Sequence, residues 1–187
     1  MSIEKIIIND YSFYLEDYGE NKGKVIITNW DNDLNFSYYW SAMGMDLKSF
    51  LQKIDNGYFL NKMIPREQQE VFSSKNTAKN IRKIWKEEIM QWYEHLEFQK
   101  SFREKLKSFL DEIIDQNHFI YAFDSFINSL DYHLINGYYE SKSVEENIRE
   151  ILSQEPWHLI ETEPSMVYKN LSKTFDQLKL NLKTSHL

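Results

Sequence analysis

Five basic residues at helical spacing are the most distinctive chemical pattern in this sequence of 187 residues. An α-helix places side chains that are three, four, seven or eight positions apart on one face, where a row of cations can contact phosphate groups or an acidic partner. The members of this basic stripe are Lys75, Lys79, Arg82, Lys83 and Lys86. The alternative is the solvated outer face of an amphipathic helix that buries Ile81, Trp85 and Trp92.

Four aromatic residues form a second candidate site, and we expect them to bind a partner protein. Tyr38, Tyr39 and Trp40 are consecutive, and Trp30 precedes them by one predicted strand. Because side chains alternate along a strand, Tyr39 points away from Tyr38 and Trp40, so that only one of the two faces belongs to the core. An exposed face could stack on bases or form a protein-binding hot spot, whereas a helix that covers it would remove both roles.

Metal sites have weaker support in the sequence. Asp31 opens a stretch with oxygen ligands at the first, third and fifth positions of a calcium loop, but Phe36 and Ala42 occupy the positions that need Gly and Glu. We therefore expect a hairpin turn there. Two histidines, His118 and His158, follow an acidic residue at one-turn spacing, which is the spacing of two metal ligands but also arises by chance.

Catalytic signatures are absent from the sequence. The chain contains no cysteine, which excludes disulfides, a thiol nucleophile and thiolate metal sites. It also lacks the Gly-x-Ser-x-Gly element of serine hydrolases and the glycine-rich phosphate loop. We expect His133 to be a hydrogen-bonded core histidine rather than a ligand. The sequence thus predicts no catalytic residue, no metal and no cofactor, and an enzyme is the less favoured class.

Charge is unevenly distributed along the chain. The formal net charge is −7, which disfavours general binding of nucleic acid by phosphate neutralisation. Residues 75–107 nevertheless hold nine Lys and Arg against five Glu, whereas the rest of the chain has an excess of eleven acidic residues. The N-terminal apolar run, Ile6 to Ile8, is too short for a signal peptide, and no run approaches about 18 apolar residues. We expect a cytoplasmic protein without membrane segments.

The elements that would position these residues indicate an α+β fold. Alternating and β-branched residues between positions 3 and 40 predict an antiparallel meander of three or four strands. Apolar residues at helical spacing then predict a mostly helical body. The expected helices are 47–54 with Asp46 as N-cap, 58–64, one capped at Asn76 or Thr77 and running to Leu96, 100–114, a central helix 118–134, 143–152 with a Ser143–Glu146 capping box, and one that starts at Pro164.

The length favours a single domain over residues 1–187, with one continuous core, since domains average roughly 150 residues. Within it, residues 1–64 supply the sheet and short helices, and residues 76–187 supply the helical part.

Residues 11–64 resemble a group of small proteins of unknown activity that are encoded in phage and prophage genomes. The segments that carry the resemblance are Gly23 to Ile27, Phe36 to Gly44, Leu47 to Leu51 and Tyr58 to Met63, and Tyr-Trp-x-Ala-Met-Gly is the most specific of them. The resemblance implies a setting in a mobile genetic element, with the host cytoplasm as the compartment. It implies no activity and no catalytic residue.

Three functions remain open from the sequence. The leading hypothesis is a non-enzymatic protein that binds a host or defence protein and inhibits a defence or nucleic-acid-processing complex. It rests on the resemblance, the acidic composition and the missing catalytic motifs. The alternative is a nucleic-acid-binding module that uses the basic stripe. The second alternative is a metal-dependent hydrolase.

Overall fold

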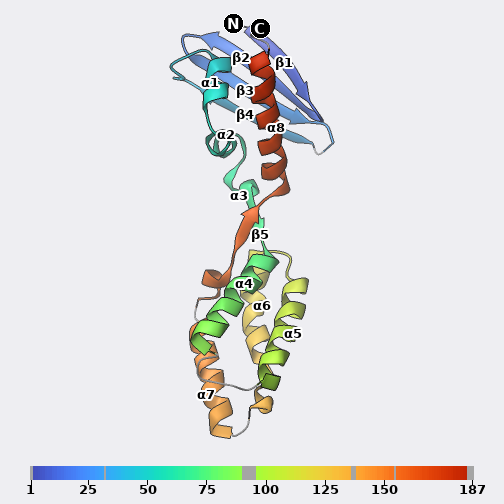
Figure 1. Cartoon of the computed structure of the whole chain (residues 1–187), viewed down its shortest axis with the longest axis vertical. Coiled ribbons are helices and arrows are strands. Elements are labelled where there is room, and N and C mark those ends of the chain that lie inside the picture. Colours follow the sequence, from blue (N-terminus) through green and yellow to red (C-terminus); the bar gives the residue numbers. More distant parts are fainter. Residues whose placement is uncertain (1, 32, 90–95, 136–137, 154, 185–187) are drawn as a thin grey trace. The chain divides into compact units, whose positions relative to one another are not determined.

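The computed structural model describes residues 2–31, 33–89, 96–135, 138–153 and 155–184. It confirms the α+β class, because a four-stranded antiparallel sheet precedes a mostly helical remainder (Figure 1). The chain folds into two compact units. Unit 1 comprises Met1–Glu70 and Pro164–Leu187, and unit 2 comprises Val71–Glu163.

The sheet of unit 1 is the predicted meander, with four strands in sequence order. Each strand pairs antiparallel with the next, and Phe13 lies between Ile6 on one neighbouring strand and Ile27 on the other. Because side chains alternate, these three residues share one face. The strands are β1 (Ser2–Ile8), β2 (Tyr11–Gly19), β3 (Lys22–Asn29) and β4 (Leu34–Trp40).

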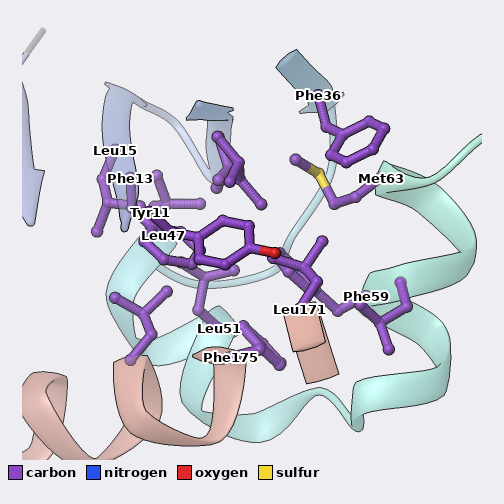
Figure 2. Packing of buried hydrophobic residues seen from close by; sticks show 14 of the residues in the cluster. Tyr11, Phe13, Leu15, Phe36, Leu47, Leu51, Phe59, Met63, Leu171 and Phe175 are labelled. Atoms are coloured by element: carbon purple, nitrogen blue, oxygen red, sulfur yellow. The ribbon is translucent and has the colours of Figure 1, made fainter. Parts of the chain in front are cut away.

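Three helices pack on this inner face of the sheet and enclose the core of unit 1 (Figure 2). Phe59 and Phe175, from two of these helices, stack with ring centroids 3.8 Å apart, and both are fully buried. The last helix therefore returns to a sheet formed more than a hundred residues earlier. The helices are α1 (Leu47–Lys53), α2 (Asn56–Met63) and α8 (Met166–Thr184), and the short α3 (Arg66–Gln69) follows α2.

Side-chain caps fix where these helices begin. Asp46 caps α1 as predicted, since its carboxylate accepts a hydrogen bond from the Ser49 N–H at 2.9 Å. The expected start of α2 was wrong by two residues. Asp55 is its N-cap and accepts from the Tyr58 N–H at 2.8 Å, so that the helix includes the two residues we expected in a turn.

Unit 2 is helical and has its own cluster of buried hydrophobic side chains. We expected one continuous core, and the buried side chains form two clusters, one for each unit. The elements of unit 2 are α4 (Ser74–Ile84), a π-helical turn η1 (Trp85–Ile89), α5 (Leu96–Glu112), α6 (Gln116–Asn128), a 3-10 turn η2 (Tyr132–Leu134), α7 (Tyr138–Ile148), a π-helical turn η3 (Arg149–Ser153) and a 3-10 turn η4 (Pro156–Leu159).

A short strand pair was missed by the sequence analysis. The strands β5 (Glu70–Phe72) and β6 (Thr162–Pro164) pair with each other where the chain passes between the two units. Three-residue strands are too short to show an alternating pattern. Pro164, where we expected the last helix to start, is instead the last residue of β6. The helix begins at Met166, and the Ser165 hydroxyl accepts a hydrogen bond from the Tyr168 N–H at 3.1 Å.

The predicted central helix was too long. The structure ends α6 at Asn128 and continues into η2, so that His133 is exposed and is not a core residue. Ser129 is the C-cap of α6, and beyond it the Asp131 carboxylate accepts hydrogen bonds from Ser101 and Lys105 of α5, which hold this part of the chain against α5.

Other helix limits also needed correction. The cap of α4 is Ser73 rather than Asn76 or Thr77, and Ser143 lies inside α7 instead of capping a helix. Leu96, expected on a buried stripe, is 79% exposed at the start of α5. None of the helices within the described ranges is long and apolar enough to cross a membrane.

Candidate nucleic-acid interface

Two adjoining hollows in unit 2 lie between α4 and α5, and we call them together the basic groove. Their volumes are about 360 Å³ and 350 Å³, and Arg82 lines both of them. The start of α4 faces the end of α5 in the first hollow, and Trp85, just beyond α4, faces the first half of α5 in the second. The two helices are therefore antiparallel along the groove.

Six cations line the basic groove, and all of them are exposed. One carboxylate, Asp111, lines it as well. The structure gives these six cations no ion-pair partner within the described part of the chain, whereas nearby Lys105 is held by Asp131 at 2.7 Å. The groove is therefore electropositive and its cations are available to a ligand. The six cations are Lys75, Lys79 and Arg82 from α4, Lys86 from η1, and Arg103 and Lys107 from α5.

The bottom of the groove is apolar. Ala78 and Leu110 contribute to the first hollow, and Trp85 and Phe102 contribute to the second. The rings of Trp85 and Phe102 stack with their centroids 3.5 Å apart. This stacking joins the π-turn after α4 to α5, and it fixes the two rows of cations relative to each other.

Trp85 also leaves a hydrogen-bond donor unused. Its side chain is 3% exposed, and the buried indole N–H has no hydrogen-bond partner among the residues that the structure describes. A buried polar group without a partner costs about 1–3 kcal/mol. Trp85 is also the first residue of a π-helical turn, a distortion that is frequent at functional sites.

The structure divides the predicted basic stripe. Four of its five residues line the groove, whereas Lys83 is exposed but lines neither hollow. Arg103 and Lys107 were missed, although their spacing of four residues within a predicted helix was a usable signal. Trp92, expected on the buried side, lies outside the described residues.

The predicted aromatic site does not form one surface. Trp30 and Tyr39 are 77% and 47% exposed, but Tyr38 is half-buried and Trp40 is 5% exposed in the core of unit 1. Trp40 packs edge-on against Tyr38 at 4.8 Å and parallel to Phe59 at 6.3 Å. Its burial follows from the alternation that places Tyr39 on the opposite, outer face.

The outer face of the sheet carries several exposed apolar side chains. Ile7 pairs with Ser12 and Lys24 pairs with Tyr39 in the strand register, which assigns these residues to the face opposite the core. Ile3 and Ile7 are about 60% exposed, and Tyr18 packs against Tyr39 at 5.9 Å. This face is a second candidate surface.

The histidine pairs have local structural roles. Asp115 caps α6 by accepting from the His118 N–H at 2.8 Å, and Glu155 contacts the exposed His158. Within the described ranges, no three His, Asp or Glu side chains converge to hold a metal ion. His95 and His186 lie outside those ranges.

Comparison with known proteins places the chain in a phage setting. A family model named Phage_phiTE_072 and described as a phage family matches residues 2–184. The match confirms the resemblance to phage proteins and extends it from residues 11–64 to nearly the whole chain, including the helical part. No curated protein and no solved structure matches the chain.

Proposed function

We propose a binding function for this chain, which belongs to the phage family Phage_phiTE_072. Its basic groove binds nucleic acid, the function that the sequence analysis held as an alternative. One observation carries the proposal: six exposed cations and a single carboxylate line two adjoining hollows with an apolar bottom. Phosphate groups meet the cations, and the sugar and base parts of the ligand meet the apolar bottom.

The net charge of −7 is compatible with this proposal. Residues 111–163 hold ten more acidic than basic residues, so that the acidic excess lies in a different part of the sequence from the cations of the groove. Exposed charges separated by more than about 8–10 Å are largely screened at physiological salt. We expect the cations that line the groove to dominate binding, although Asp111 lies among them, and we expect binding to weaken strongly with salt.

A salt titration with short labelled DNA and RNA tests the proposal. We expect the logarithm of the binding constant to fall with the logarithm of salt concentration with a slope of up to about −4, since each phosphate contact on a single strand contributes about −0.7. The double variant Lys79→Gln/Arg82→Gln should reduce affinity at least tenfold. Lys83→Gln is the matched control, because Lys83 lies on the same helix outside the groove.

Two results would overturn the proposal. One is the absence of binding at 50 mM salt for both DNA and RNA. The other is an equal loss of affinity in the double variant and in the Lys83→Gln control, because the groove would then have no special role.

A second function, binding of a host or defence protein by an inhibitor, is favoured by the exposed outer face of the sheet. Ile3, Ile7 and Tyr39 would supply the apolar contacts. The test is a nuclease-treated pull-down with wild-type protein and with Ile3→Ser/Ile7→Ser as baits. A stoichiometric partner that the variant fails to retain would support this function, and equal retention would exclude the outer face. We do not propose the metal-dependent hydrolase, because no described cluster favours it.

A further inference from the structure

We infer that the basic groove takes a single strand of nucleic acid rather than a duplex, and that one phosphate of this strand sits in the second hollow and accepts a hydrogen bond from Trp85. This inference rests on the proposed function and specifies its ligand. Three observations carry it: the small size of the hollows, the apolar surface between two rows of cations, and the buried donor without a partner.

The dimensions of the groove suit a few nucleotides. From Lys75 to Lys86 the first row of cations spans eleven residues, or about 16 Å at 1.5 Å per residue. Phosphates of one stacked strand follow each other at about 3.4 Å, and an unstacked strand is longer. The row therefore covers about three to five phosphates, close to the lower limit for single-strand binding sites.

The bottom of the groove distinguishes a single strand from a duplex. A duplex keeps its bases paired and stacked inside and would present mainly phosphates and sugars to a shallow groove. The apolar surface of Ala78 and Leu110 would then lie against charged backbone and gain nothing. A single strand can turn a base onto this surface while its phosphates contact Lys75, Lys79 and Lys107.

The second hollow has the features of a phosphate site. It is lined by Arg82, Lys86 and Arg103 together with Trp85 and Phe102, and it has no carboxylate lining. The ring of Trp85 is buried and already stacked on Phe102, so it is not available to stack on a base. Its contribution is the indole N–H, which is itself buried, so that the Trp85 side chain has to shift as the ligand enters before it can donate to a phosphate oxygen.

Fluorescence anisotropy with the full chain tests the inference. The probes are a labelled eight-nucleotide DNA strand and a blunt duplex of the same sequence at 100 mM salt. We expect the single strand to bind at least tenfold more tightly. Trp85→Phe keeps an aromatic ring but removes the donor, and it should weaken single-strand binding threefold to tenfold. Trp40→Phe is the matched control, because Trp40 also has a buried indole N–H without a described partner, but in unit 1.

The outcomes separate this inference from the proposed function. Equal affinity for duplex and single strand, with both weakened by Lys79→Gln/Arg82→Gln, would overturn the inference and leave the proposed function standing. Absence of binding to either probe would overturn both. An acidic peptide of equal charge that competes as well as the single strand would also overturn the inference. If Trp85→Phe fails to fold by circular dichroism, the exposed Arg103→Gln decides instead, and unchanged affinity in it would remove the phosphate site.

Discussion

A single carboxylate, that of Asp131, connects the segment after α6 to the neighbouring helix α5. It accepts hydrogen bonds from the Ser101 hydroxyl and from Lys105, and these contacts hold its pKa below the ordinary value of 3.8. They join the chain after α6 to α5, and α5 carries one row of cations in the basic groove. A residue outside the groove thus contributes to the geometry of its wall.

Asp131→Asn should destabilise unit 2 by about 1 kcal/mol at neutral pH, because a half-exposed charge-assisted contact is worth about that much. Because the folded-state pKa is depressed, this stabilisation is present above pH 3.8 and is lost as the pH falls through the folded-state value. The free energies of unfolding of wild type and variant should therefore differ at pH 7, and this difference should shrink as the pH falls below 3.8. A constant difference across this range would show that the charge is not responsible.

Gly23 is a position of the sheet where a side chain would press against α1. A Cβ atom there would lie 3.0 Å from Leu47 Cδ1 and 3.2 Å from Leu47 Cβ. Gly23→Ala should therefore lower the free energy of unfolding by about 1–3 kcal/mol, the usual cost of overpacking. Chemical denaturation measures this, with Lys24→Ala on the opposite face as control. An effect below 0.5 kcal/mol would mean that α1 shifts freely to accommodate the methyl group.

At the scale of the element, the strands of the sheet were predictable and several helix ends were not. The alternation of apolar residues such as Tyr11, Phe13 and Leu15 indicates which face of the sheet is buried, and it does so from this segment of the sequence alone. The segment that follows α6 instead contacts α5 through Asp131 and Ser101, which are 30 residues apart in the sequence. A pattern confined to one segment does not contain that information.

The candidate site also combines a feature that one segment of the sequence predicts with features that depend on packing. The spacing of Lys75, Lys79, Arg82 and Lys86 was enough to predict one row of cations. The second row, on α5, joins the site only because α5 packs beside α4 and antiparallel to it, which the sequence analysis did not establish. The missing hydrogen-bond partner of Trp85 is likewise a property of packing.

Helix α8 comes from the far end of the chain and supplies part of the core of unit 1. Phe175→Ala removes a fully buried ring that stacks on Phe59 at 3.8 Å, and it should cost about 3–5 kcal/mol. Leu180→Ala on the same helix is the control, since Leu180 is 61% exposed. Tryptophan fluorescence during urea unfolding reports both. Similar losses in the two variants would contradict the role of α8 in the core.

At the scale of the whole molecule, unit 2 is inserted between two parts of unit 1. The chain enters unit 2 through β5 and leaves it through β6. The two ends of the insertion are adjacent. The Ser165 N–H donates to the Gln69 carbonyl at 2.9 Å, and the Ser73 N–H donates to the Glu161 carbonyl at 3.0 Å. Each unit has its own cluster of buried side chains. We expected a single domain, which means that the two units unfold together, and this stays a prediction.

Excised unit 2, residues 71–163, should fold by itself and keep the groove. The 18 buried hydrophobic residues that the structure describes in its core form one cluster, and its ends are neighbours through Ser73 and Glu161. A chain of this length buries a little over 60% of its unfolded surface, which is enough for marginal stability. We expect cooperative urea unfolding of the fragment and nucleic-acid affinity within threefold of the full chain. Non-cooperative unfolding would instead mean that unit 2 needs unit 1 and that the chain behaves as one domain.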